Sequence, residues 1–160
     1  MSDLRQSLAA EKSILLQQKA NTWEEAIALC VAPLEQSGAV SDAYAKAIIA
    51  STLAHGPYYI LTPGMAMPHA RPEDGVMRNA FSLITLVEPV IFPDGKPVSI
   101  LVCLAATSAE IHLSKAIPQI IALFELDDIF NKLAQAEDES AIYDLLEQTK
   151  GSKYLANFTD

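Results

Sequence analysis

Residues 81–106 read FSLITLVEPVIFPDGKPVSILVCLAA and decide the fold class. Two segments within them, 81–87 and 98–106, are almost continuously apolar, which is typical of strands covered on both faces. Glu88-Pro89 is expected to end the first strand, and Pro93-Asp94-Gly95 is expected to form a turn. Buried strands among helical segments predict an α/β fold, with a mixed β-sheet sandwiched between helices.

The segments that precede these strands alternate between helical and extended patterns. A capping box at Thr22 and Glu25 is expected to begin one helix, because both side chains can satisfy free backbone N–H groups. Apolar spacing and stop signals predict helices over 2–10, 22–38 and 41–56, an edge strand over 13–16, and strands over 58–61 and 65–67.

The segments that follow are predicted to be helical. Because Pro118 is tolerated only in a first turn, we expect the next helix to begin near Ser114 and not at Ser108. Asp127 or Asp128 is expected to cap a further helix, and residues 139–148 form the last one. The length of the chain predicts one domain over 1–150, followed by a C-terminal tail over 151–160.

Composition excludes several classes of protein. Of 160 residues, 51% are apolar, which supports a sizeable core. The net charge of −9 disfavours binding to nucleic acid or anionic lipid, which require clustered Lys and Arg. No apolar stretch is long enough for direct membrane insertion, and residues 1–10 do not resemble a secretory signal. Cys30 and Cys103 form neither a disulfide framework nor a zinc motif, so we expect a cytoplasmic protein with reduced thiols.

Three histidines are candidates for chemistry. His69 lies in a loop after a short strand, and His112 follows the strand that ends at residue 106, so the two are expected to share one site. A neutral imidazole is a good nucleophile near pH 7 and can carry a phosphoryl group, while a second histidine can donate a hydrogen bond to it. Arg71 and Arg78 could offset the negative charge of a phosphate. His55 is interpreted as a residue at a helix C-terminus.

Residues 63–76, PGMAMPHARPEDGV, resemble the phosphorylation loop of the mannitol/fructose-type A components (EIIA) of the bacterial sugar phosphotransferase system. Within this type, the loop is most similar to that of the ascorbate-specific branch. Residues 108–113, SAEIHL, are similar to the segment that carries the second histidine of the family. The resemblance covers about residues 1–150 in length and order of elements.

The resemblance implies a mannitol-type EIIA-like fold and an enzyme of the phosphotransferase class. His69 would be the phosphorylated residue, and His112 would stabilise the phosphoryl group. The donor would be the phosphocarrier protein HPr, and the acceptor a cysteine of a cognate EIIB, which serves a membrane EIIC that takes up an ascorbate- or pentitol-like sugar. No cofactor or metal is implied. Mannitol-type members carry an arginine on the helix before the loop, which residues 50–54 lack, so Arg71 is the candidate replacement.

Two other functions remain open at this point. A regulatory EIIA-like domain would also be phosphorylated on His69, but would control a protein target. A metal-binding module using His55, His69 and His112 is the second alternative, although their spacing matches no known metal motif. If transient partners bind over His69, an exposed apolar ring that includes Ala66, Met67 and Ala70 is expected.

Overall fold

The computed structural model describes residues 3–155, apart from the side chain of Leu113. Its centre is a four-stranded sheet with the order β1-β3-β4-β2. β3 and β4 pair antiparallel, whereas β1 pairs with β3 and β2 with β4 in parallel, so the sheet is mixed. The strands are β1 (Ile14–Gln18), β2 (Gly64–Ala66), β3 (Ala80–Ile91) and β4 (Pro97–Ala105).

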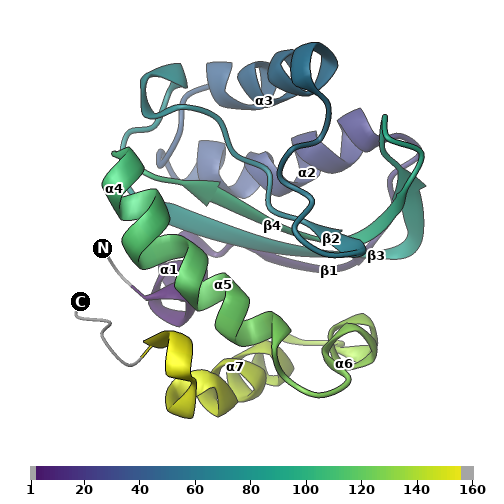
Figure 1. Ribbon diagram of the computed structural model, residues 1–160, viewed down its shortest axis with the longest axis vertical. Coiled ribbons are helices and arrows are strands. Elements are labelled where there is room, and N and C mark those ends of the chain that lie inside the picture. Colours follow the sequence, from purple (N-terminus) through teal and green to yellow (C-terminus); the bar gives the residue numbers. More distant parts are fainter. Residues whose placement is uncertain (1–2, 156–160) are drawn as a thin grey trace.

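Helices cover both faces of this sheet (Figure 1). α2 (Trp23–Gln36) and α3 (Ala43–His55) lie on one face. The other face carries α1 (Leu4–Glu11), α5 (Ile117–Phe124), α6 (Ile129–Gln135) and α7 (Glu139–Glu147). This arrangement confirms the predicted α/β sandwich. The N-terminal and C-terminal ends of the described chain lie near each other, on the side of α1 and α7.

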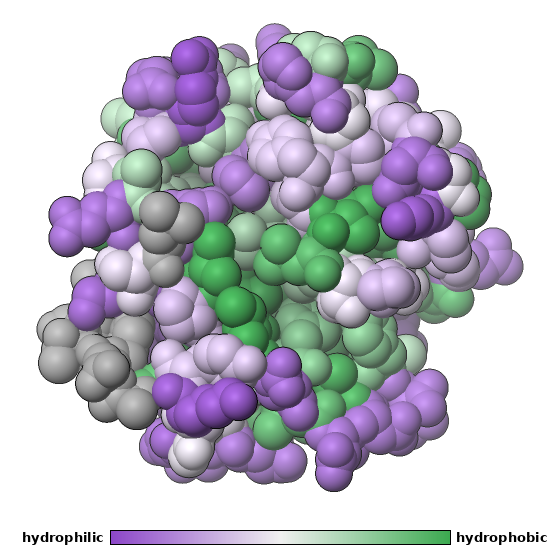
Figure 2. Space-filling model, in the orientation of Figure 1, coloured by the Kyte–Doolittle hydropathy of each residue, from purple (hydrophilic) through white to green (hydrophobic). Residues whose placement is uncertain are grey.

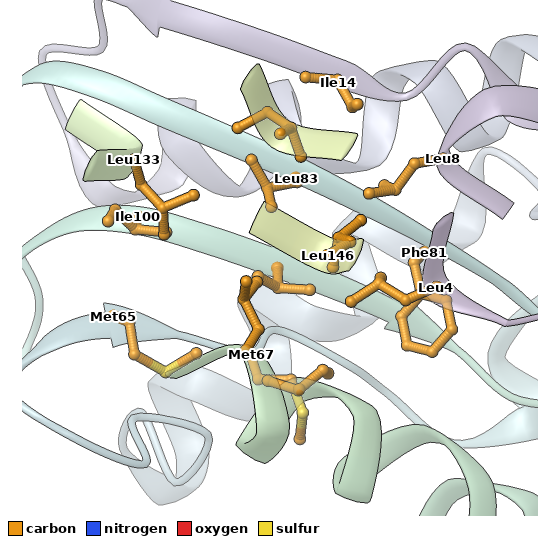
Figure 3. Close-up of a cluster of buried hydrophobic side chains, with 14 of the residues drawn as sticks. Leu4, Leu8, Ile14, Met65, Met67, Phe81, Leu83, Ile100, Leu133 and Leu146 are labelled. Atoms are coloured by element: carbon orange, nitrogen blue, oxygen red, sulfur yellow. The ribbon is translucent and has the colours of Figure 1, made fainter. Parts of the chain in front are cut away.

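Side chains alternate across the central strands and build a separate core on each face. Leu83, Ile100 and Val102 pack against α1, α5, α6 and α7, and Figure 3 shows this cluster. Ile84 and Leu101 point to the opposite face, where they pack against α2 and α3. Complete burial of such a side chain contributes about 1.5–3 kcal/mol. The sheet is therefore anchored on both faces.

β3 does not end at Glu88-Pro89, so the predicted end of this strand is wrong. The strand continues to Ile91, and its register against β4 shifts between Thr85 and Val90. Proline cannot donate a ladder hydrogen bond, and an irregularity of this kind accommodates it without ending the strand. The predicted turn at residues 93–95 is present, with the N–H of Gly95 donating to the carbonyl of Phe92 at 2.8 Å.

Residues 58–61 are not a strand, which is a second correction. The N–H of Ile60 donates to the carbonyl of Pro57 at 3.2 Å and closes a turn. Tyr59 is fully buried, and its hydroxyl bonds to Thr52 of α3 at 2.7 Å. The aromatic and β-branched pattern therefore serves packing under α3, and not pairing with another strand.

The helix predicted from Ser114 begins six residues earlier, at the position that the prediction excluded. The side chain of Ser108 accepts from the N–H of Ile111 and caps α4 (Ala109–Ile111). A π-helical turn, His112–Ala116, then leads into α5. Its closing bond runs from Ile117 to the carbonyl of His112, five residues back. Proline lacks an N–H and clashes with the carbonyl four residues before it, so a widened turn ahead of Pro118 removes the conflict.

The remaining predictions concern the cysteines, two helix caps and the tail. Cys30 and Cys103 are free and buried. Thr22 caps α2 as predicted, but Asp128 stands at the start of α6 without a side-chain cap bond. Two 3₁₀ turns occupy Gln148–Gly151 and Lys153–Leu155, and residues 156–160 of the predicted tail lie outside the described residues. Within residues 3–155, no helix is both long and apolar enough to cross a bilayer.

Candidate active site

The loop that carries His69 follows β2 and is fixed on both sides of the histidine. The N–H of Met67 donates to the carbonyl of Tyr59 at 2.9 Å, and the N–H of Leu104 in β4 donates to the carbonyl of Pro68 at 3.0 Å. The hydroxyl of buried Tyr44 accepts from the N–H of Ala70 at 3.1 Å and donates to the carbonyl of Leu104 at 2.6 Å. The His69 backbone is therefore tied to the rigid sheet and to α3.

One ring nitrogen of His69 is bonded to the protein itself. Its Nδ1 lies 2.9 Å from the carbonyl oxygen of Met67. A carbonyl can only accept a hydrogen bond, so Nδ1 carries the proton. In the neutral ring, Nε2 is then left with the free lone pair, and it is the nitrogen available as a nucleophile.

The structure brings His112 to His69, as the sequence predicts. The two imidazole centroids lie 4.4 Å apart, with an angle of 52° between the ring planes. His69 comes from the loop after β2, and His112 begins the π-helical turn after α4. The π-helical turn therefore carries His112, the histidine that lies beside His69.

Both rings face an open pocket of about 390 Å³. Its walls combine apolar and polar groups from three segments of the chain. They are Tyr58, His69, Ala70, Arg71, Pro72, Ala106, Ser108, Ala109 and His112. Such a concave site can hold a group of phosphoryl size and leaves one side open for a partner molecule.

Burial lowers the pKa of both histidines. For His69, the loss of water around the charged form lowers the pKa, and the hydrogen bond to Met67 partly opposes this effect. For His112, burial and then the neighbouring His69 lower the pKa to about 4. Both rings are therefore neutral near pH 7, the state in which an imidazole nitrogen can attack phosphorus.

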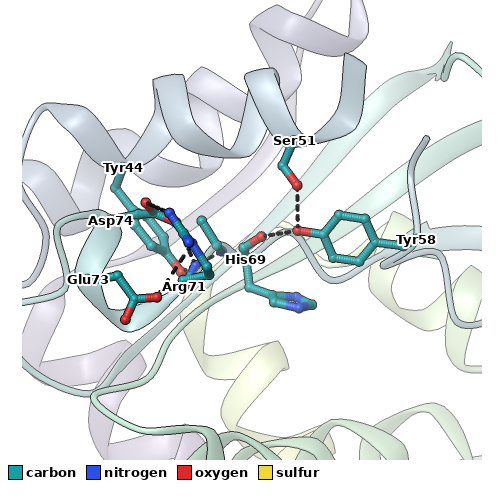
Figure 4. A network of polar contacts seen from close by, with 8 residues as sticks. Tyr44, Ser51, Tyr58, His69, Arg71, Glu73 and Asp74 are labelled. Atoms are coloured by element: carbon teal, nitrogen blue, oxygen red, sulfur yellow. Dashed lines mark hydrogen bonds and ion pairs between the residues drawn. The ribbon is translucent and has the colours of Figure 1, made fainter. Parts of the chain in front are cut away.

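The two arginines near His69 in the sequence lie differently in space. Arg78 binds Glu11 with two bonds of 2.9 and 2.8 Å and is not among the residues that line the pocket, so the structure does not support its predicted role beside a phosphate. Arg71 does line the pocket. Its guanidinium, however, pairs with Asp74 through two bonds of 3.1 Å, and Figure 4 shows the side chain turned away from the imidazole of His69.

His55 does not join the other two histidines. It ends α3 and lines a neighbouring hollow, not the pocket of His69 and His112. Within the described part of the chain, no group of three or more His, Cys, Asp and Glu side chains is arranged to hold a metal ion. The geometry therefore gives no support to a site made of the three histidines.

Three residues of the site were missed by sequence reasoning. Ser108 lines the pocket, whereas the local rule for Pro118 predicts no helix start at that position. The sequence pattern predicts Tyr58 in a strand and Tyr44 in the helix over 41–56, without a role in the site for either. An aromatic residue just after the Gly56-Pro57 stop is the one signal in the sequence that points to Tyr58.

The expected apolar ring is made of other residues. Ala66 and Met67 are buried, so that part of the prediction is wrong, and Ala70 is half-buried. The exposed large apolar side chains beside the site are Tyr58 and Leu61, which belong to the turn between α3 and β2. Ala66 and Met67 point into the core from the end of β2, whereas Tyr58 and Leu61 are exposed to solvent.

Replacing Tyr44 by phenylalanine tests how the loop is held. The substitution leaves the N–H of Ala70 and the carbonyl of Leu104 without their partner, so we expect the free energy of unfolding to fall by about 1–3 kcal/mol. Urea denaturation measures this loss. Tyr154→Phe, on the exposed 3₁₀ turn, is the matched control and should change stability by less than about 0.5 kcal/mol. Equal stability of the two variants would show that the Tyr44 hydroxyl does not hold the loop.

Comparison with known proteins places the chain in one family. The family model for the phosphoenolpyruvate-dependent sugar phosphotransferase system, EIIA 2, matches residues 7–149. The ascorbate-specific EIIA component of Escherichia coli is 42% identical over 93% of this chain and 98% of its own. The crystal structure of a putative IIA (PtxA) from Streptococcus mutans is 54% identical, with a TM-score of 0.96 over 97% of this chain and 99% of that one.

A more distant neighbour shares the fold alone. It is IIA of the mannitol system, in a solved complex with phosphorylated IIB from Escherichia coli, at 23% identity and a TM-score of 0.73 over 86% of this chain and 95% of that one. The matches of 41–54% identity nevertheless cover nearly the whole of both chains. This protein therefore belongs to the EIIA 2 family of the phosphoenolpyruvate-dependent sugar phosphotransferase system, and it is a phosphotransferase component that carries phosphoryl groups.

Proposed function

We propose that Nε2 of His69 takes a phosphoryl group from phosphorylated HPr and passes it to a cysteine of a cognate EIIB. The observation that carries this proposal is the bond between Nδ1 of His69 and the carbonyl of Met67, which leaves Nε2 as the nucleophile of a neutral ring. The lowered pKa keeps that ring neutral at physiological pH. His112 lies beside it in the same open pocket.

The transfer needs no group beyond the two proteins. The lone pair of Nε2 attacks the phosphorus of the donor phosphohistidine, its N–P bond breaks, and the donor imidazole leaves with the electron pair. In the second transfer, the thiolate of EIIB attacks the same phosphorus, and Nε2 of His69 is the leaving group. Catalysis of both transfers then depends on the positioning of the reacting groups and on stabilisation of the negative charge on the phosphoryl oxygens.

His112 stabilises the phosphoryl group in this proposal. Before transfer it is neutral, because burial and His69 hold its pKa at about 4. A phosphoryl group on His69 adds between one and two negative charges close by, which favours the protonated form and raises the pKa of His112. The imidazolium can then donate a charge-assisted hydrogen bond to a phosphoryl oxygen. The second histidine therefore supplies positive charge only when the site is loaded.

The surface around the pocket suits transient partners. Figure 2 shows apolar side chains gathered in a hollow between α5 and the turn that connects α3 to β2. Leu61, Met65 and Phe124 are among the residues that line a groove of about 190 Å³ there. Both donor and acceptor must cover His69, so we infer that they share this apolar surface in turn. The solved mannitol IIA–phosphorylated IIB pair supports an EIIB as one of these partners.

The substrate and the location are inferred from the relatives. The curated relatives are named ascorbate-specific, so we propose an ascorbate-like sugar, taken up through a membrane EIIC. The relay would work in the cytoplasm, without direct membrane insertion of this chain. No observation favours the regulatory alternative, in which phosphorylated His69 would control a protein target.

Intact mass spectrometry tests the proposed function. The protein is mixed with enzyme I, HPr and phosphoenolpyruvate, and its mass is followed with time. We expect a gain of one phosphoryl group that is lost in acid and is removed when the cognate EIIB is added. No gain, while another EIIA accepts phosphate in the same mixture, would refute the proposal.

The pKa values predict how the site responds to acid. Only a neutral His69 can accept phosphate, and its pKa is lowered, so acceptance should persist at pH values where an ordinary histidine, with a pKa of about 6.5, is half protonated. Acidification should inhibit only below that value. NMR titration of the ring protons measures the midpoints directly, and the midpoint for His112 is expected at about 4. Midpoints at or above the ordinary value for both rings would contradict the assigned burial effects.

A further inference from the structure

Tyr58 is a large aromatic residue that is left 47% exposed beside His69. Its hydroxyl donates to the backbone carbonyl of His69 at 2.9 Å. Its ring also meets the imidazole edge-on, with centroids 5.3 Å apart and an angle of 86° between the planes. One side chain therefore contacts both the backbone and the ring of the same histidine.

Tyr58 is itself held from α3. The hydroxyl of Ser51 donates to the hydroxyl of Tyr58 at 3.4 Å, and Figure 4 shows the two contacts meeting at that oxygen. The ring of neighbouring Tyr59 packs edge-on against Tyr58, with centroids 5.1 Å apart. The position of Tyr58 is thus set by a helix on one side and by a buried ring on the other.

The placement of Tyr58 also separates two hollows. It lines the pocket that holds His69 and His112, and it lines the neighbouring hollow of about 540 Å³ along α3. Ala70 and Arg71 also line both hollows, so Tyr58 belongs to the wall that the two spaces share. If the bond from the Tyr58 hydroxyl to the His69 carbonyl is removed, the His69 backbone can shift, and the imidazole can lose the bond between Nδ1 and the carbonyl of Met67.

We propose that Tyr58, steadied by Ser51, is a positioning residue that keeps His69 in the orientation and tautomer in which Nε2 faces the pocket. The inference rests on the proposed function for its effect on phosphoryl transfer, but the tautomer of His69 is a property of the free protein. Transfer depends steeply on alignment, because a reacting nitrogen displaced by about 1 Å can cost on the order of 100-fold in rate.

The test compares Tyr58→Phe with the wild-type protein and with Tyr154→Phe, whose hydroxyl lies on the exposed 3₁₀ turn outside both hollows. Two quantities are measured. Nitrogen-15 NMR of the free protein gives the fraction of His69 that carries its proton on Nδ1. Steady-state phosphorylation by phosphorylated HPr gives kcat and KM.

For Tyr58→Phe, we expect a smaller fraction of the Nδ1–H tautomer and a fall in kcat of about tenfold, with KM unchanged, because the ring still covers the surface. Ser51→Ala, which removes only the bond from α3, should shift both quantities in the same direction by less. Tyr154→Phe should match the wild type.

Two results would overturn the inference. The first is a wild-type tautomer fraction and kcat in Tyr58→Phe. The second is a rise in KM with kcat and tautomer unchanged, which would make Tyr58 a docking residue only. If the wild type is not phosphorylated at all, the proposed function fails, and the tautomer fraction alone then decides the role of Tyr58.

Discussion

Replacing His69 by alanine is expected to reduce phosphorylation by HPr to the level of the uncatalysed background. The substitution removes Nε2 of His69, the nitrogen that takes the phosphoryl group in the proposed transfer, and His112 is proposed only to stabilise that group. Loss of a covalent nucleophile typically removes several orders of magnitude in rate, about 10⁴ or more. Quantitative intact mass, read as phosphorylated fraction against time, measures the effect.

The fold should survive this change. The lost side-chain bond to Met67 contributes about 1 kcal/mol, and the loop keeps its backbone bonds to Tyr59 and Leu104. His55→Ala is the matched control, because it removes an exposed histidine outside the pocket and should accept phosphate as the wild type does. Phosphorylation of His69→Ala at the wild-type rate would move the acceptor to another residue.

Replacing His112 by alanine is expected to slow the two phosphoryl transfers unequally. Acceptance from HPr should continue at a reduced rate, because Nε2 of His69 is still present and neutral. Transfer to EIIB should fall by about 100-fold, the loss usually found when one donor that stabilises transferring charge is removed. Rapid-mixing measurements with a radioactive phosphoryl group separate the two rates.

A second variant distinguishes the contribution of the positive charge of His112 from that of its hydrogen bond. His112→Gln keeps a neutral hydrogen-bond donor but cannot become cationic beside the phosphate, so it should recover only part of the lost transfer rate. If His112→Ala accepted phosphate from HPr and passed it to EIIB at wild-type rates, the two histidines would not act together, although their rings lie 4.4 Å apart.

The features that sequence reasoning predicted correctly are those with strong local signals. The continuous apolar segments at 81–87 and 98–106 became the two central strands, because only a sheet covered on both faces buries such segments completely. The pairing of His69 and His112 followed from their positions after apolar strands, and the structure brings both rings to one pocket.

The errors lie where tertiary contacts outweigh local rules. Pro118 was used to exclude a helix start at Ser108, but a π-helical turn absorbs the proline and places His112. The apolar pattern of residues 58–61 serves packing under α3, and its exposed member, Tyr58, contacts His69. Arg78 is near His69 in sequence, yet its strong bond to Glu11 holds it elsewhere. The π-helical turn and the ion pair of Arg78 have no signal within a short stretch of sequence.

In the proposed relay, the phosphoryl group is carried on Nε2 of His69. The most direct measurement is long-range nitrogen–proton NMR of the nitrogen-15-labelled protein, after phosphorylation by phosphoenolpyruvate, enzyme I and HPr. We expect one phosphohistidine, at His69, with phosphorus on Nε2 and the proton retained on Nδ1. Phosphorus on Nδ1, or on His112 or any other residue, would contradict it.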